Sequence, residues 1–122
     1  MKLITKEIKA KLLANGRRQE PVRGTVSELD LVPVAHIFDP FGGGRWLLSE
    51  IYPHDRGLAF GLCDLGFGEA ELGDVSLKDL ENLSKNLENK RGVGLERDRY
   101  FKPTKTIGEY ADVSSAAGRI EV

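Results

Sequence analysis

Alternating apolar and polar positions in the middle of the chain predict a small β-sheet. The richest stretch, Trp46–Leu77, contains strand-forming runs separated by glycines, with an acidic residue every few positions. We expect strands over residues 33–38, 45–52, 58–65 and 71–75, each bounded by turn-forming residues. The connections between them are short, so neighbouring strands must be antiparallel, because a parallel pair needs a long crossover.

The clearest helix signal lies directly after the fourth strand. Ser76 and Asp79 have the capping-box pattern, in which the serine hydroxyl accepts a backbone amide hydrogen and the carboxylate binds back to the serine amide. Leucines then recur at helical spacing, which predicts a helix over residues 77–87 with one face packed on the sheet. These leucines are Leu77, Leu80, Leu83 and Leu87.

A first helix is expected near the N-terminus. Thr5 can cap a helix over residues 6–14, and Asn15-Gly16 is a typical helix end. Residues 17–31 are polar and weakly patterned, which predicts a loop across the surface. The loop residues expected to touch the core are Val22, Val26 and Leu29.

The C-terminal part is expected to add little to the core. Residues 93–97 can form an edge strand, and Thr106 with Glu109 repeats the capping-box pattern. A short helix through Ala111 should follow. From about residue 112 the chain is small and polar, which predicts a loose tail.

Composition is that of a globular protein. Of the 122 residues, 40% are apolar and 30% are charged, enough for a core without metal or disulfide staples. We therefore expect one α+β domain over residues 1–122, with a small antiparallel meander packed by helices. No apolar run approaches the roughly 18 residues that a membrane helix requires. Cys63 is the single cysteine, so a reducing, cytoplasmic setting is expected.

Charge is segmented along the chain although the net charge is −1. Residues 1–24 carry seven Lys/Arg and two Glu, and residues 85–105 carry seven Lys/Arg and three acidic residues. Between them, residues 50–82 carry eight acidic residues against Arg56 and Lys78. The segments can pair with one another in the fold or be solvated, or they can form a basic patch for nucleic acid or an acidic face for a basic partner.

A basic and aromatic segment after residue 96 is the main candidate for a binding function. In surfaces that bind single-stranded nucleic acid, cations bind phosphates and exposed rings stack on bases. The structural alternative is that the two rings anchor the C-terminal segment to the sheet while Arg97 pairs with an acidic strand residue. The candidate residues are Arg97, Arg99, Tyr100, Phe101, Lys102 and Lys105.

The glycine run Gly42–Gly44 before Arg45 could cradle a phosphate with backbone amides. No Lys-Ser or Lys-Thr follows it and no helix is expected there, so a hairpin turn is the better interpretation. Phe41 at the tip of this turn is a candidate partner-binding residue, because exposed apolar loop tips often contact partners.

Metal and nucleophile chemistry have weak support. A divalent cation would need three converging carboxylates, and a strand-end carboxylate such as Asp64 more often caps a turn or pairs with a cation. His36 is expected to face solvent or a sheet edge, and its spacing to His54 and Cys63 fits no zinc pattern. Cys63 is expected to be a buried, inert thiol. The acidic candidates are Glu50, Asp55, Asp64, Glu69, Glu71 and Asp74.

The motifs of this chain resemble the DUF2958 family. They cover nearly the whole chain in order, and include KLITK at residues 2–6, WLLSE at 46–50, AFGLCDLG at 59–66, and FKPTKT at 101–106. Family members are short proteins encoded largely on bacterial plasmids, phages and integrative elements. The resemblance implies an accessory gene of mobile DNA that serves conjugation, plasmid maintenance or evasion of host defence. It implies no activity.

Three functions are compatible with these features. The first is a non-catalytic accessory protein that binds a protein partner, such as a host defence complex. The second is a nucleic-acid-binding module that uses Arg97–Lys105. The third is a small metal-dependent enzyme that uses Glu50 and Asp64. We expect the first, with no cofactor and no membrane contact.

Overall fold

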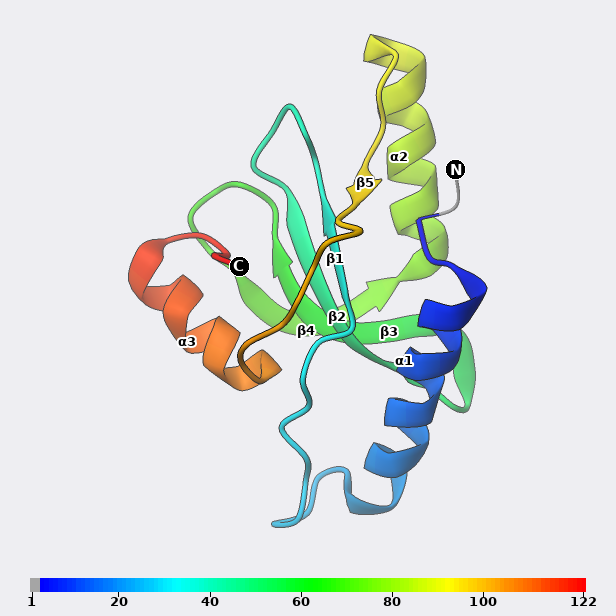
Figure 1. Ribbon diagram of the computed structural model, residues 1–122, viewed down its shortest axis with the longest axis vertical. Helices are drawn as coiled ribbons and strands as arrows, with labels where there is room; N and C mark the ends of the chain where they lie inside the picture. Colours follow the sequence, from blue (N-terminus) through cyan, green and yellow to red (C-terminus); the bar gives the residue numbers. More distant parts are fainter. Residues whose placement is uncertain (1–2) are drawn as a thin grey trace.

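The computed structural model describes residues 3–122, which fold into a five-stranded antiparallel sheet with three α-helices (Figure 1). The strand order β4-β3-β2-β1-β5 is a four-stranded meander to which β5 adds at the free edge of β1. The fold class is α+β, as the sequence predicts. The elements are α1 (Lys6–Gln19), the 3₁₀ helix η1 (Glu20–Val22), β1 (Ala35–Phe38), β2 (Arg45–Tyr52), β3 (Asp55–Asp64), β4 (Glu71–Ser76), α2 (Leu77–Arg91), β5 (Glu96–Arg97) and α3 (Ile107–Ala117).

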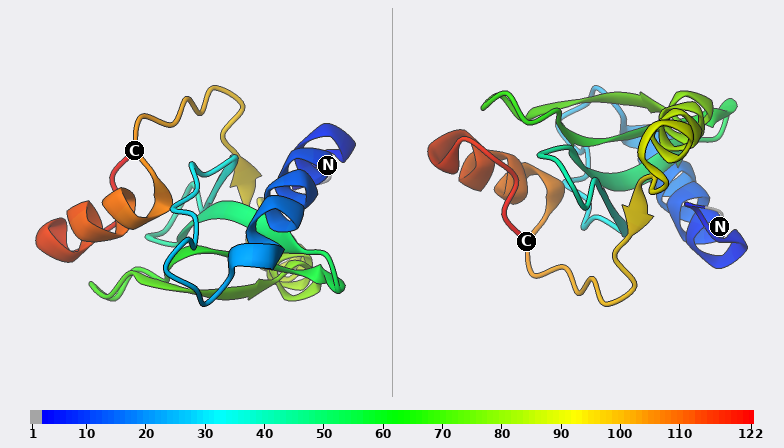
Figure 2. Two further views of the ribbon diagram at one scale, coloured as in Figure 1. Left: turned by 90° about the horizontal axis from the view of Figure 1, so that it is seen from below. Right: turned by 90° about the horizontal axis from the view of Figure 1, so that it is seen from above.

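Helices pack against both faces of the sheet. Side chains alternate between the two faces of a strand, so the neighbours Leu47 and Leu48 of β2 belong to different apolar clusters. Leu48 shares a cluster with residues of α1 and α2, and Leu47 shares one with Tyr110 of α3. Accordingly, α3 lies on the other side of the molecule from α1 and α2 (Figure 2). Within residues 3–122, no helix is long and apolar enough to cross a membrane.

The first helix begins as predicted but ends later. Thr5 caps it, with its Oγ1 accepting the Ile8 amide at 3.2 Å. The predicted stop after Ala14 is wrong, because α1 continues to Gln19. Gly16 is buried where the helix meets β2, and a Cβ there would lie 1.8 Å from the carbonyl oxygen of Ile51. Glycine at this position therefore permits close helix–sheet packing and does not terminate the helix.

The second helix also begins as predicted and runs beyond the expected end. Ser76 Oγ accepts the Asp79 amide at 3.2 Å, which is the serine half of the predicted capping box. The helix ends at Arg91, and Gly92 follows with a left-handed φ of 83°. A glycine at that place closes a helix without the steric cost that a Cβ would bring.

The inward face of α2 differs by one position from the predicted stripe. Leu80 is only 4% exposed and packs on the sheet, as expected, whereas Leu83 is 38% exposed. Ser84 is buried in its place, and its Oγ accepts the Leu95 amide at 3.0 Å. The segment before β5 passes over this turn of the helix and needs a hydrogen-bond acceptor there, which a leucine cannot provide.

The last helix is longer than predicted, and the segment after it is folded onto the sheet. Thr106 and Glu109 form the predicted reciprocal capping box, but α3 runs to Ala117 and not to Ala111. Ile120 is 3% exposed, and its amide donates to Asp64 Oδ2 at 3.0 Å. The residues expected as a loose tail from about 112 thus include six further helical positions and a core side chain.

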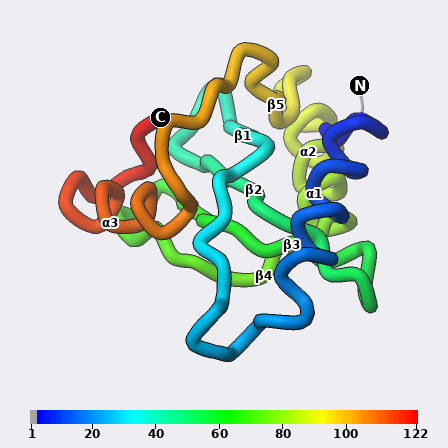
Figure 3. Tube along the Cα trace, turned by 60° about the horizontal axis from the view of Figure 1, so that its bottom comes forward, coloured from blue at the N-terminus to red at the C-terminus, as the bar shows by residue number. Residues whose placement is uncertain are grey.

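A long connection, residues 23–34, joins the end of η1 to β1 (Figure 3). Two of the side chains expected to reach the core do not: Val26 is 107% exposed and Leu29 is 38% exposed. Leu31 is buried instead. Gln19 holds the connection in place, because its side-chain amide donates to the Leu29 carbonyl oxygen at 2.7 Å and accepts from the Leu29 amide at 2.8 Å.

Candidate functional site

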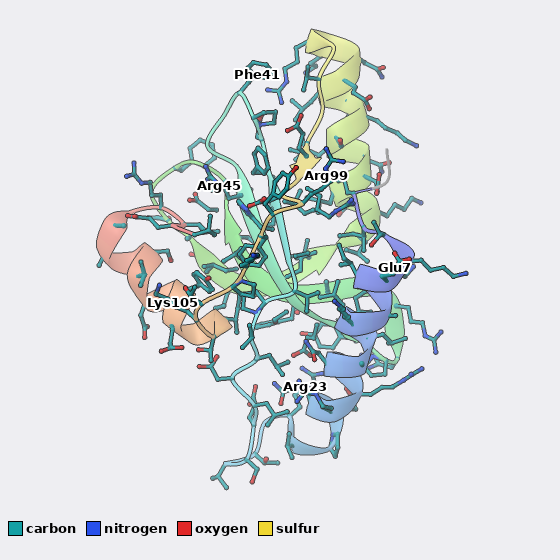
Figure 4. The ribbon with its side chains drawn as sticks, viewed as in Figure 1. Glu7, Arg23, Phe41, Arg45, Arg99 and Lys105 are labelled. Carbon is teal, nitrogen blue, oxygen red and sulfur yellow. The ribbon has the colours of Figure 1, made fainter. Side chains whose placement is uncertain are left out.

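The basic and aromatic segment is divided between two parts of the molecule. Figure 4 shows Arg99 beside β5, close to the β1–β2 hairpin, whereas Lys105 lies at the start of α3. Arg99, Tyr100 and Lys102 are exposed, and Tyr100 is 86% exposed. Lys105 is half-buried, with its Nζ 5.4 Å from the ring centroid of Tyr110. The six candidates therefore do not form one continuous face.

Two other members of the segment make structural contacts. Arg97 is half-buried and its Nη1 donates to the Leu3 carbonyl oxygen at 2.9 Å, which ties the chain before α1 to β5. Phe101 is half-buried and packs on the cluster of Tyr110. Its ring centroid is also 5.7 Å from that of His36. Phe101 thus anchors the C-terminal segment to the sheet, as the structural alternative predicts.

His36 is buried, so the expectation that it faces solvent or a free edge is wrong. It is 2% exposed, because β5 and the residues after it cover the edge of β1. Nδ1 lies 3.1 Å from Asp98 Oδ2, and Nε2 lies 3.1 Å from Arg45 Nη1. Both contacts are satisfied by the neutral tautomer that donates from Nδ1 and accepts at Nε2. We refer to His36, which is buried, together with its half-buried partners Asp98 and Arg45 as the buried triad.

Electrostatics favour this neutral imidazole. Burial lowers the pKa of His36 below its ordinary value. The hydrogen bond to Asp98 acts in the opposite direction, and the positive charge of Arg45 lowers the pKa further. His36 is therefore uncharged at neutral pH and can accept a hydrogen bond from the arginine.

The buried triad forms one wall of a hollow of about 420 Å³ beside β1, which we call the β1–β5 hollow. The guanidinium of Arg45 lies 5.9 Å from the ring centroid of Phe38. Asp98 accepts a hydrogen bond from His36 Nδ1 on one carboxylate oxygen and a hydrogen bond from the Tyr100 amide, at 3.0 Å, on the other. The complete lining is His36, Phe38, Arg45, Glu96, Arg97, Asp98, Arg99, Tyr100 and Val122.

Two hairpin tips lie together at one end of the sheet. The backbones of Gly43 and Gly66 touch, since a Cβ on Gly43 would lie 2.9 Å from Gly66 Cα. Phe41 is 70% exposed, as its position in a turn suggests. Leu65 and Phe67, on the other tip, are 61% and 85% exposed and were not expected as site residues. The sequence signal was present, because both flank Gly66 in a turn between strands, as Phe41 precedes its own glycine run.

The first tip is held by the end of α2. Arg91 Nη2 donates to Asp39 Oδ1 at 2.6 Å, and its guanidinium lies 5.4 Å from the Phe41 ring centroid. Partial burial acts to raise the pKa of Asp39, but hydrogen bonds from Arg91 and the Phe41 amide outweigh it and lower the pKa. The ion pair therefore persists at neutral pH and limits the conformations that the tip can adopt.

Glu50 belongs to a separate structural cluster under the residue 23–34 connection. A break in the β2–β3 register between Leu48 and Glu50 marks a bulge, and bulges redirect the side chains that follow them. Glu50 is 1% exposed, with its Oε1 2.7 Å from Arg23 Nη2. Burial opposes the charge of Arg23, but the ion pair with Glu50 outweighs it and raises the pKa of the guanidinium. Arg23 also lies over the Tyr52 ring at 4.6 Å.

The other acidic candidates do not converge. Asp64 is buried and accepts the Gly66 amide on Oδ1 and the Ile120 amide on Oδ2, so it caps a turn and binds the C-terminal segment. In the register of β2 and β3, Glu50 lies opposite Phe60 and Asp64 lies opposite Arg45. The two carboxylates are therefore at different ends of β2. Within residues 3–122, no three His, Cys, Asp or Glu side chains are grouped so as to hold a metal ion.

Cys63 is a half-buried strand residue that packs on the larger apolar cluster. Burial, together with the negative charge of Glu71, raises the pKa of its thiol to about 11. A thiol with so high a pKa is almost entirely protonated at neutral pH and is a poor nucleophile.

Comparison with known proteins gives one match. The model of a family described as protein of unknown function (DUF2958) matches residues 3–121. No curated protein and no solved structure matches the chain. The family match spans nearly the whole chain and agrees with the motifs found in the sequence. The chain belongs to the DUF2958 family.

Proposed function

We propose that this protein is a non-catalytic binding protein that contacts a protein partner through its two adjacent hairpin tips. One observation supports this proposal: neighbouring turns expose three large apolar side chains, those of Phe41, Leu65 and Phe67. Large aromatic side chains are enriched at the energetic centres of protein interfaces. A group of large apolar side chains on a protein surface is costly to leave exposed to water.

The tips are also arranged as a binding surface should be. Contact between Gly43 and Gly66 and the ion pair of Arg91 with Asp39 hold the first tip before any partner arrives. Preorganisation of this kind reduces the entropy lost on binding. The aromatic side chains can therefore contribute more of their interaction energy to affinity.

Charge near the tips indicates the chemistry of the partner. A hollow of about 370 Å³ between the tips and the end of α3 is lined by Arg45, Arg119 and glycine backbone. Asp64 also lines it, but both of its oxygens accept backbone amides. A complementary surface would present apolar side chains bordered by carboxylates. The mobile-element context implied by the family resemblance makes a component of a host defence system a suitable partner.

Affinity capture from nuclease-treated host lysate tests this function. The wild-type protein, immobilised as bait, would be compared with the double variant Phe41→Ser/Phe67→Ser and with the control Val26→Ser. The control removes an even more exposed apolar side chain from the residue 23–34 connection. We expect one protein to be retained by the wild type and the control and lost by the double variant. With that protein purified, calorimetry should show a loss of affinity of about 30-fold or more, typical of a removed interface hot spot.

Two results would contradict the proposal. One is a captured protein that the double variant binds as well as the wild type does. The other is capture that disappears after nuclease treatment, since it would mean that nucleic acid bridges the two proteins. Circular dichroism of each variant provides the folding control, because all three positions are exposed and their substitution should leave the fold intact.

A further inference from the structure

We propose that the β1–β5 hollow binds single-stranded nucleic acid, with a base stacked on Tyr100 and a phosphate bound by Arg45 and Arg99. This site goes beyond the protein-binding function and uses different aromatic residues. The hairpin tips and the hollow share only Arg45, which lines both. The two proposals can therefore be tested separately with variants of Tyr100 and Arg99 for one and of the tip residues for the other.

The buried triad gives Arg45 a fixed orientation. Its guanidinium has five N–H donors in a planar fork, and Nη1 donates to His36 Nε2 at 3.1 Å. His36 is in turn fixed by Asp98, and the stack of His36 on Phe38, with ring centroids 5.4 Å apart, limits rotation of the imidazole. Other donors of the same guanidinium can reach a phosphate, and arginine binds phosphate oxygens in a bidentate manner.

The burial of His36 between two charged partners is hard to explain by stability alone. Polar groups removed from water contribute little net stability even when all are paired, and an apolar core of the same shape often does as well. A buried histidine that carries a carboxylate on one side and an arginine on the other does, however, orient the arginine. A cation held in a fixed orientation at the wall of a hollow favours the binding of an anion there.

Tyr100 supplies the second requirement of a single-strand site. Tyr100 is 86% exposed and lines the hollow, while its backbone amide donates to Asp98 Oδ1 at 3.0 Å. The backbone is thus fixed and the ring is open to a planar ligand. Stacking of a base on such a ring is tolerant of sequence, because every base has a π-face.

The charge of the hollow favours an anionic ligand. Three arginines line it, Arg45, Arg97 and Arg99, against the carboxylates of Glu96 and Asp98. Both oxygens of Asp98 already accept hydrogen bonds, from His36 and from the Tyr100 amide. The volume of the β1–β5 hollow, about 420 Å³, lies within the range of sites that hold small organic groups, such as one nucleotide unit of a strand.

Fluorescence anisotropy with a labelled oligothymidylate of about 12 nucleotides, within the usual site sizes of such proteins, tests the site at low salt. We expect Tyr100→Ala to weaken binding by between about five-fold and 100-fold, with the salt dependence unchanged. Tyr100→Phe keeps the ring and should bind as the wild type does. Arg99→Gln should weaken binding and reduce the slope of log K against log salt by about 0.7, the value for one phosphate of a single strand.

Matched controls decide whether the binding is specific to the hollow. Arg56→Gln removes an equally exposed arginine from β3, beside the β2–β3 turn, and should leave binding unchanged. Phe41→Ser/Phe67→Ser should also leave it unchanged. A duplex of the same sequence should compete poorly, because its bases cannot stack on Tyr100.

Several outcomes would overturn the proposal. Unchanged binding by Tyr100→Ala would show that no base stacks there. Equal losses for Arg99→Gln and Arg56→Gln would mean that attraction is general to the surface. Displacement of the oligonucleotide by thymidine monophosphate or inorganic phosphate, at equal phosphate concentration, would assign the hollow to a small phosphate ligand. Absence of any salt-sensitive binding at low ionic strength would leave the buried triad as a purely structural feature.

Discussion

At the scale of single residues, Gly16 shows how tertiary contact reverses a local preference. Alanine is more favourable than glycine inside a helix by about 1 kcal/mol. A Cβ at position 16 would, however, lie 1.8 Å from the Ile51 carbonyl oxygen, so α1 would have to move away from β2. We expect Gly16→Ala to lower the free energy of unfolding by about 1–3 kcal/mol, the usual cost of overpacking, measured by urea denaturation.

The control for this variant is Ala10→Gly in the same helix. Ala10 is exposed, so its substitution should cost only the helix propensity of about 1 kcal/mol. A stabilised Gly16→Ala protein would mean that α1 does not approach β2 as closely as the structure shows.

Cys63 supports a second prediction at the residue scale. With a pKa of about 11, raised by burial and by Glu71, only about 0.1% of the thiol is ionised at pH 8. We expect a thiol reagent at pH 8 to label native protein far more slowly than protein in urea, followed by absorbance. Equal rates in the two states would show an open, reactive thiol and would revive nucleophilic chemistry at this position.

At the scale of elements, the residue 23–34 connection is attached to α3 by the Asp30 carboxylate and by the Leu31 carbonyl oxygen, which accepts the Ile107 amide at 2.7 Å. Asp30 accepts the Thr106 hydroxyl at 2.6 Å and the Gly108 amide at 2.9 Å, at the positive end of the helix dipole. We expect Asp30→Ala to cost about 1 kcal/mol, in the range of a lost helix cap, and to speed amide exchange in the first turn of α3. Hydrogen exchange followed by mass spectrometry measures the second effect.

Ser27→Ala is the matched control in the same connection, because Ser27 is exposed and lies three positions before Asp30. Its exchange pattern in α3 should equal that of the wild type. Unchanged exchange in Asp30→Ala would show that the capping box of Thr106 and Glu109, with the hydrogen bond from the Ile107 amide to the Leu31 carbonyl oxygen, secures the helix start without Asp30.

At the scale of the whole molecule, the buried triad should make stability depend on pH. Burial and the charge of Arg45 lower the pKa of His36 in the folded state, although the hydrogen bond to Asp98 opposes them. Below about pH 6.5, the ordinary value, the unfolded chain therefore binds a proton that the folded chain does not. We expect the contribution of His36 to stability to be complete above this pH and to be lost as the pH falls from about 6.5 through the lower pKa of the folded state.

Denaturation of the wild type and of variants over this pH range tests whether His36 causes this pH dependence of stability. His36→Gln should show a smaller fall in stability than the wild type, and the difference isolates His36 from the carboxylates. His54→Gln removes the exposed histidine and should keep the fall. If stability falls equally in the wild type and in His36→Gln, the imidazole is not held neutral between Asp98 and Arg45.

Local sequence determined the starts of the helices and the topology of the meander, whereas β1, β3 and β5 begin at residues 35, 55 and 96 and not at the expected 33, 58 and 93. The caps at Thr5, Ser76 and Thr106 and the antiparallel pairing of β1 to β4 depend on residues a few positions apart, and each is confirmed. Exposure of Phe41 was also predictable, because a glycine-rich turn places its apolar residue away from the sheet.

Tertiary structure decided where the helices end and which side chains are brought together. Gly16 ends a helix in isolation but packs against Ile51 in the fold, and Ser84 replaces Leu83 in the core because the chain before β5 crosses that turn. His36 and Asp98 are 62 positions apart and meet only because β5 pairs with β1. Periodicity and capping arise from interactions within a few residues, whereas the hollow and the hairpin tips arise from contacts between distant segments, which no local pattern specifies.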